Sequence, residues 1–224
     1  MTQKNTSRTG LITLACFAVC LLCRADIPYL SADSCESVFE QLKSPEAVAD
    51  DAYRKQLIHK FFLAEPASSI PFVLKKLWTG PSSHSPQHRQ SHEMDCYIVR
   101  TILAEMPVEV QEVLVSTKTD TPNQKARLLE AMGMFKTPLA FDGLRESLSD
   151  QRLSNLGAAL YGGWPYRVCD IAYNTLILRL RLTDFRAPLG VNHSYAQRNR
   201  WIRRLKDWLG TNSEEAAEVF SNHP

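Results

Sequence analysis

Residues 121–150 read TPNQKARLLEAMGMFKTPLAFDGLRESLSD, and this stretch predicts two helices joined by a tight turn. Thr121-Pro122 and Thr137-Pro138 each place a capping hydroxyl before a proline, and proline suits the first position of a helix. Apolar residues follow at helical spacing, namely Ala126, Leu128, Leu129 and Met132, then Leu139, Phe141, Leu144 and Leu148.

The same pattern extends in both directions along the chain. Ser44-Pro45 is a further helix start, and helical spacing predicts helices over residues 45–63, 69–78, 94–105, 107–117, 166–182 and 195–209, with a short acidic helix at 213–220. Polar or glycine-containing stretches at 79–92, 151–165 and 183–193 are predicted to be irregular. The tail LILRLRL of 166–182 alternates with a period of two and also fits a strand, but no partner strand is visible. We therefore expect an all-α fold.

Two segments resemble HEAT repeats, which are antiparallel helix pairs of about 40 residues that stack into a solenoid. One is residues 121–150, and the other is Tyr166-Arg167-Val168-Cys169-Asp170-Ile171-Ala172. The resemblance implies a short HEAT-like α-solenoid of the armadillo-like class over residues 45–210. Residues 26–44 would then be an N-terminal cap or linker and residues 211–224 an acidic C-terminal segment.

The resemblance also implies a ladder of aspartate–base pairs along the inner loops. Asp170 matches the aspartate of this ladder, with Arg167 or Arg179 as its basic partner. Asp150 would serve the preceding repeat.

The first 25 residues differ from the rest and predict an export signal. Lys4 and Arg8 precede the apolar run LITLACFAVCLLC, and small residues follow up to Ala25. This run is too short to be a comfortable membrane span. We expect cleavage after Ala25 and a periplasmic or secreted protein with no stable membrane span.

Removal of this segment changes the charge and the cysteine content. It takes away three basic and no acidic residues, which leaves 23 basic and 24 acidic ones, so bulk affinity for nucleic acid is not expected. Cys35, Cys96 and Cys169 remain, too few for a disulfide scaffold. A Cys96–Cys169 bridge is left open.

Charge is distributed unevenly along the remaining chain. Residues 26–150 hold 13 basic and 18 acidic groups, whereas residues 151–210 hold 10 basic and 3 acidic ones. On the 195–209 helix, Arg200, Arg203, Arg204 and Lys206 lie away from the apolar stripe of Trp201, Leu205 and Trp208. They either neutralise the protein's own acids or face a partner.

Three functions fit these observations. The leading one is a non-catalytic interaction scaffold that binds a protein of the envelope or extracellular space, with Trp164, Tyr166, Arg200 and Arg204 as contact residues. The second is an anionic ligand, a lipid head group or acidic glycan, on the basic 151–210 surface. The third is a metal-dependent enzyme built on His84, His88 and His92 with Glu93 and Asp95 nearby. Because Pro86 interrupts the histidines and no catalytic set is visible, we expect no enzyme, metal or cofactor.

Overall fold

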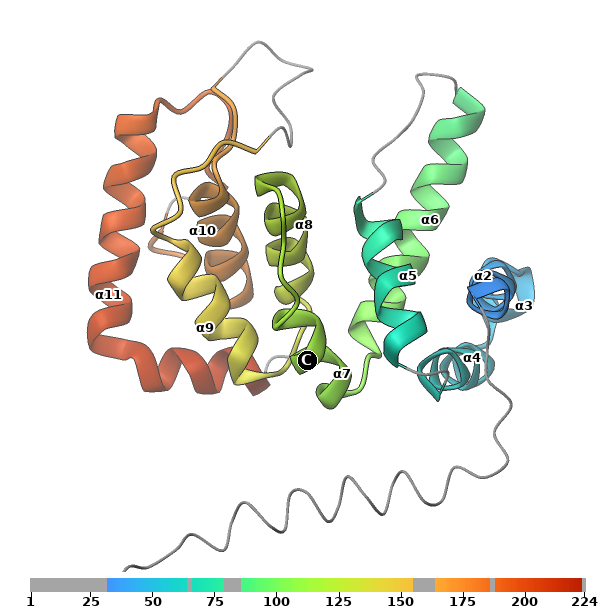
Figure 1. Cartoon of the computed structure of the whole chain (residues 1–224). Helices are drawn as coiled ribbons and strands as arrows, with labels where there is room; N and C mark the ends of the chain where they lie inside the picture. Colours follow the sequence, from blue (N-terminus) through green and yellow to red (C-terminus); the bar gives the residue numbers. More distant parts are fainter. Residues whose placement is uncertain (1–31, 64–65, 79–85, 155–163, 186–187, 223–224) are drawn as a thin grey trace, which may run out of the picture.

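The described part of the chain is built from α-helices (Figure 1). The structure is a computed structural model that describes residues 32–63, 66–78, 86–154, 164–185 and 188–222. These residues form α2 (Ala32–Gln41), α3 (Pro45–Ala49), α4 (Asp51–Leu63), α5 (Pro66–Trp78), α6 (Pro86–Ala104), α7 (Val108–Val115), α8 (Pro122–Met132), α9 (Pro138–Ser147), α10 (Val168–Arg179) and α11 (Tyr195–Asn222). Within the same ranges there is no strand, only an isolated bridge between Leu153 and Arg167. The all-α prediction is confirmed.

Three helices begin where the proline signals predicted. Ser44 Oγ accepts the amide of Ala47 at 3.2 Å, and Thr137 Oγ1 accepts the amide of Leu139 at 3.3 Å. At α8 the cap is reciprocal: Thr121 Oγ1 accepts the amide of Gln124, and Gln124 Oε1 accepts the amide of Thr121, both at 3.2 Å. Each cap satisfies backbone donors that the helix itself leaves unpaired.

The single helix predicted from residue 45 is wrong, because the chain breaks at Asp50. This residue has extended backbone angles, φ −107° and ψ 106°. Its Oδ1 accepts the amides of Ala52 and Tyr53 at 2.9 and 3.1 Å and so starts α4 as a separate helix. An aspartate that bonds to amides ahead of it favours a cap over a helix interior, which explains the break.

The predicted loop at 79–92 is also corrected in part, since α6 begins at Pro86. The proline stands at the first helical position, as at α8 and α9, where its missing amide costs nothing. The polar composition that suggested a loop reflects the outer end of a long helix.

In the C-terminal half of the chain, two helices end at other residues than the sequence analysis predicted. Helix α10 ends at Arg179, and Arg181 has a positive φ of 52°, so the LILRLRL tail is not a strand. Helix α11 is kinked at Asn212 (φ −123°, ψ 24°), two residues beyond the predicted stop at Gly210. Asn212 Nδ2 and Thr211 Oγ1 donate to Trp208 O at 2.8 and 3.0 Å and satisfy a carbonyl at the bend.

Each helix packs on helices one to three places away in chain order, so the described helices follow one another across the molecule (Figure 1). Helices α2, α3 and α4 pack together and onto α5, which also meets α6, α7 and α8. Helices α8, α9 and α10 form the next group, and α11 packs against α9 and α10. Every described helix contributes to one connected apolar core.

The segments expected at the two ends are parts of this core. In α2, Cys35, Val38 and Phe39 are buried, and the Phe39 ring meets Phe72 of α5 edge-on. Beyond the kink of α11, Phe220 is fully buried against Phe141 of α9. Both ends therefore contribute buried apolar area to the stability of the fold.

Candidate functional site

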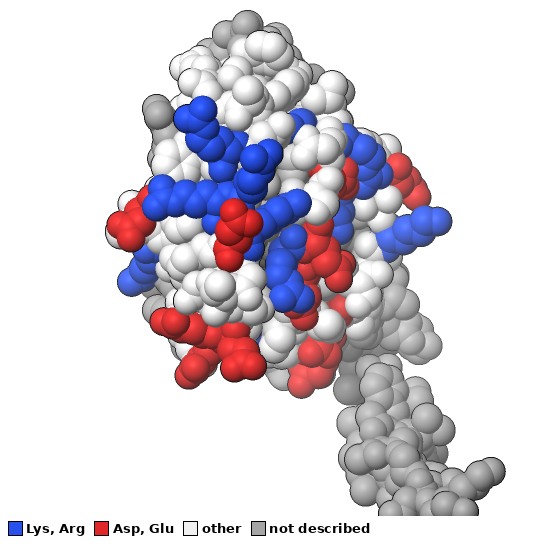
Figure 2. Space-filling view, turned by 90° about the vertical axis from the view of Figure 1, so that its left-hand side faces the viewer, with Lys and Arg blue, Asp and Glu red and all other residues white. Residues whose placement is uncertain are grey.

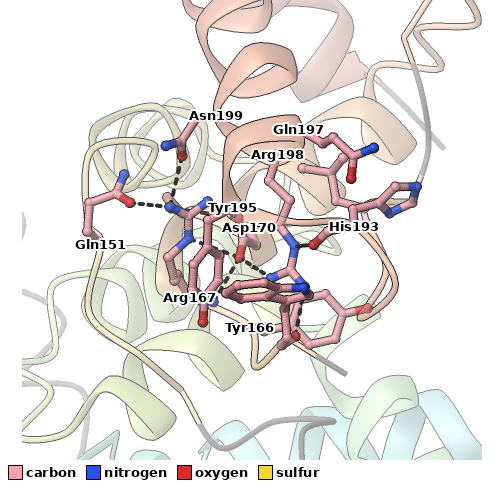
Figure 3. A network of polar contacts seen from close by, with 12 residues as sticks. Gln151, Tyr166, Arg167, Asp170, His193, Tyr195, Gln197, Arg198 and Asn199 are labelled. Carbon is pink, nitrogen blue, oxygen red and sulfur yellow. Dashed lines mark hydrogen bonds and ion pairs between the residues drawn. The ribbon is translucent and has the colours of Figure 1, made fainter. Parts of the chain in front are cut away.

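A buried carboxylate at the start of α10 organises the basic end of the molecule (Figure 3). Asp170 is fully buried and stands in the first turn of the helix, where the helix dipole favours a negative charge. Its Oδ2 accepts the backbone amide of Arg167 at 2.9 Å. The Arg167 guanidinium returns to the same carboxylate, with Nη2 2.8 Å from Oδ1. The ion pair between the two residues named from sequence is thus present.

A second arginine binds the same carboxylate, so the network holds two positive charges and one negative charge. Arg198, on α11, is fully buried and places Nη1 2.7 Å from Asp170 Oδ2. Its other donors reach backbone carbonyls at 2.7 to 3.1 Å, those of Trp164, Pro165, Gly190 and His193. All five N–H groups of the guanidinium therefore have an acceptor. Arg198 ties the 164–166 segment, the loop at 190–194 and α11 into one rigid unit.

Sequence reasoning did not find Arg198, and it left Arg179 as an alternative partner for Asp170. Arg179 instead donates to the carbonyls of Phe135 and Phe220, at 3.1 and 3.0 Å. A usable signal for Arg198 was present, because it stands in the buried register of α11 with Ile202, Leu205 and Leu209. An arginine in an apolar stripe needs a buried counter-charge.

The network supports a partly exposed aromatic pair. Trp164 is 49% exposed, and its ring meets Tyr195 at the start of α11 with centroids 4.9 Å apart. Tyr195 Oη donates to the Pro165 carbonyl at 3.2 Å, and the Arg167 guanidinium lies 4.6 Å from the Tyr195 ring centroid. The Trp164 amide donates to Val191 O at 2.9 Å. Trp164 is exposed to solvent and Tyr195 is partly buried, and the pair is held by contacts from several sides.

Tyr166, the neighbouring aromatic residue expected to contact a partner, is part of the support. It is half-buried, and the Arg198 guanidinium lies 5.2 Å from its ring centroid. Burial raises the pKa of its phenol, while Arg198 acts in the opposite direction. Its side chain therefore packs against the network and offers little free surface.

The exposed side of α11 carries arginines that form no ion pair with the residues that the structure describes. Arg200 and Arg203 make no hydrogen bond or ion pair with any part of the chain that the structure describes. Arg204 packs over the rings of Phe185 and Trp201, 5.0 and 5.2 Å from their centroids. Lys206, by contrast, donates to Ser149 Oγ at 2.8 Å.

Figure 2 shows this side of the molecule, where Lys and Arg gather across the middle with some acidic side chains among them, and further Asp and Glu lie toward the lower edge. The acidic residues beyond the kink of α11, Glu214, Glu215 and Glu218, form no ion pair with Arg200, Arg203 or Arg204. We call Trp164, Tyr195, Arg200, Arg203 and Arg204 the α11 face. It combines a rigid aromatic pair with guanidinium groups that have no counter-ion among the described residues.

The histidine region offers no support for a metal site. His84 lies outside the described residues, as do the side chains of His88 and His92. Asp95 Oδ1 is 2.7 Å from Lys43 Nζ, so this carboxylate is engaged in an ion pair. Among the residues that the structure describes, no group of three or more potential ligands gathers.

The described cysteines do not provide a nucleophile. None of Cys35, Cys96 and Cys169 forms a disulfide, so the Cys96–Cys169 bridge is absent. Burial raises the pKa of Cys169 to about 12, with the Asp170 charge adding to the shift. Its thiol is protonated at neutral pH, and a protonated, buried thiol is inert.

Comparison with known proteins gives no relative on which to base a function. No protein-family model, curated protein or solved structure matches this chain. Over the described ranges, no helix combines the length and the apolar character that crossing a membrane requires.

Proposed function

We propose that this chain is an exported, non-catalytic interaction protein of the helical-repeat type that binds an acidic protein surface through the α11 face. The observation that carries the proposal is the combination of exposed Arg200 and Arg203, without counter-ions among the described residues, with the rigidly held Trp164–Tyr195 pair. Arginine forks match carboxylates, and tryptophan, tyrosine and arginine dominate the energetics of protein interfaces.

The order of helix packing supports the helical-repeat part of the proposal. Helices close in the chain pack together along much of it, with α8, α9 and α10 in mutual contact and α11 on α9 and α10, as in a stack of helices. Helices α8 and α9 form a pair joined by the short turn that precedes Thr137, and α10 packs on both. In a HEAT-like stack the Arg167–Asp170 pair would be one rung of the ladder.

Rigidity is what distinguishes this face from an ordinary basic surface. The Asp170 network fixes the backbone beneath Trp164, so little conformational entropy remains to be lost when a partner orders the ring. We expect Trp164 to provide a central contact and the arginines to steer an acidic partner toward it.

The experiment is a crosslinking pull-down with the mature chain from its native envelope fraction, washed at low and high salt. We expect one stoichiometric protein partner that survives high salt through the aromatic contact. Trp164→Ala should weaken the complex by about 2 kcal/mol, and Arg200→Glu with Arg203→Glu should abolish capture at low salt.

Matched controls come from exposed residues of the same kinds elsewhere. Tyr97→Ala removes an aromatic side chain that is 46% exposed on α6, and Lys118→Glu reverses an exposed charge between α7 and α8. Both should retain the partner. If the face variants retain it as well, the proposed interface is wrong. If the face binds only anionic lipid vesicles or acidic glycan, in a salt-sensitive way, the protein-partner function is replaced by anionic ligand binding.

A further inference from the structure

A cavity of about 560 Å³ lies away from the α11 face, among α5, α6, α8 and α10. These helices meet where the two groups of helices in Figure 1 join, between α5–α6 and α8–α10. A cavity of this size accommodates an ordinary small-molecule ligand. Its location between helix groups is a common one for ligand sites.

Two arginines in this cavity have no partner among the described residues. Arg100 of α6 and Arg127 of α8 both line it, and neither makes a hydrogen bond or ion pair with that part of the chain. The other two basic residues of the lining are engaged: Lys76 Nζ is 2.8 Å from Glu36 Oε1, and Arg179 donates to two carbonyls. The donors of Arg100 and Arg127 are therefore available to a ligand.

Glu130 is the one acidic residue among the described side chains that line the cavity. It forms no ion pair with Arg100 or Arg127. Burial raises the pKa of its carboxyl, and the two arginines offset this only in part. With Glu130 ionised, Arg100, Arg127 and Arg179 still leave the cavity with an excess of positive charge, which favours an anionic head group.

The remaining walls are apolar. Val99 and Leu103 come from α6, Ala131 and Met134 from the α8 side, and Leu178 from α10. Leu178 is 63% exposed, the largest exposed fraction among the large hydrophobic side chains described. An apolar wall beside free guanidinium groups matches a molecule with an anionic head and an apolar body.

We propose that this cavity binds a small amphiphile with a single carboxylate head, of the acyl carboxylate class. Arg100 and Arg127 hold the carboxylate through charge-assisted hydrogen bonds, and the arginine fork fits both of its oxygens. Val99, Leu103 and Leu178 cover the acyl chain. The proposal does not depend on the α11 face, which is built from other residues.

The experiment is isothermal titration calorimetry of the full mature chain with laurate. Dodecanol serves as the uncharged analogue and inorganic phosphate as the anion without an apolar chain. We expect laurate to bind at one site and the two comparison compounds to bind at least about tenfold more weakly, since charge-assisted bonds to the head are lost with one and apolar burial with the other.

The matched variants are Arg100→Gln, Arg127→Gln and, as a control, Arg145→Gln on α9. Because Arg100 and Arg127 have no partners among the described residues, glutamine should leave the thermal unfolding temperature unchanged while laurate affinity falls about tenfold or more in each. Arg145→Gln should bind laurate as the wild type does.

Three results of the laurate and dodecanol titrations would overturn the assignment. They are the absence of laurate binding, equal affinity for dodecanol and laurate, and unchanged laurate affinity in both arginine variants. Tight binding of phosphate alone at these arginines would show a plain anion site and would also overturn it. Loss of the protein partner in the α11-face variants, or its retention, has no bearing on these outcomes.

Discussion

Asp170 is the residue on which the basic end of the molecule depends. It is fully buried between Arg167 and Arg198, which are also buried. Removing a charge from water is costly, and here the cost is offset by two ion pairs and by the carbonyls around Arg198. Without the carboxylate, the positive charges of both buried arginines would have no ion pair in this network.

We therefore expect Asp170→Asn to lower the free energy of unfolding by about 3–5 kcal/mol, the usual cost of breaking a buried ion pair. Urea denaturation at neutral pH measures it. Asp51→Asn is the matched control, because Asp51 is exposed and pairs with Arg54 and Lys55 on the surface. That change should cost far less than Asp170→Asn, because solvent screens the surface pairs. Equal losses in the two variants would contradict a structural role for the network.

Glu130 shows the opposite balance, since burial in the cavity raises the pKa of its carboxyl above the ordinary value of 4.5. A carboxyl whose pKa is raised by folding binds protons more readily in the folded state. Its contribution to stability therefore declines as pH rises from the unfolded pKa through the folded one. The charged and titratable groups that share the cavity are Lys76, Cys96, Arg100, Arg127 and Arg179.

Glu130→Gln removes this penalty and should stabilise the fold at pH 7 relative to the wild type. The gain should be less than about 1 kcal/mol, because the side chain keeps contact with solvent. It should shrink as pH falls toward 4, where the wild-type carboxyl is protonated in both states. Urea denaturation at both pH values provides the comparison. A stability gain that grows on acidification would show that folding does not raise the pKa of Glu130.

At the scale of elements, Gly133 at the C-terminal end of α8 lies in close contact with Thr175 of α10. A Cβ at this position would lie 2.6 Å from Cγ2 of Thr175, too close for an ordinary contact. The glycine has helical angles, φ −63° and ψ −15°, so the requirement is for space and not for an unusual backbone. This contact sets the spacing of two helices that line the cavity.

Gly133→Ala should accordingly destabilise the fold by about 1–3 kcal/mol through overpacking. Thr175→Ser removes the opposing methyl group and should restore most of the loss in the double variant. Thermal unfolding of the two single variants and the double variant forms a complete cycle. Additive losses without rescue would show that this contact does not limit the approach of the helices.

At the scale of the whole molecule, the sequence predicts that the protein is exported. Residues 1–25 lie outside the described residues. We expect the protein recovered from its native envelope or medium to begin at Asp26. N-terminal sequencing of that material decides the matter, and an intact Met1 on protein recovered from outside the cytoplasm would contradict cleavage.

The pattern of apolar residues and helix caps was sufficient to predict most of the helices. Cap–proline pairs at Ser44, Thr121 and Thr137 act through bonds within a few residues, so local sequence contains all the information. The predictions failed where one side chain could support either of two local structures, as at Asp50, which breaks one expected helix into two.

In the candidate site, too, contacts between residues near in sequence could be predicted and contacts between distant segments could not. Arg167 and Asp170 are three residues apart at one helix start, and the resemblance to HEAT repeats named Asp170 with Arg167 as one of its two candidate partners. Arg198 is 28 residues from Asp170, and only the packing of α11 on α10 brings it there. The cavity likewise joins Arg100 and Arg127, which lie in a part of the chain whose overall charge is acidic.

The sequence by itself determined the helical class, the positions of the proline-capped helices and the excess of basic residues at 151–210, because these depend on local bonds, spacing and composition. Tertiary structure alone decided which charges are neutralised. Arg167 and Arg198 share the carboxylate of Asp170, while Arg100, Arg127, Arg200 and Arg203 are left without counter-ions among the described residues. Ion pairing depends on distances of a few ångströms between helices, and no local pattern specifies them.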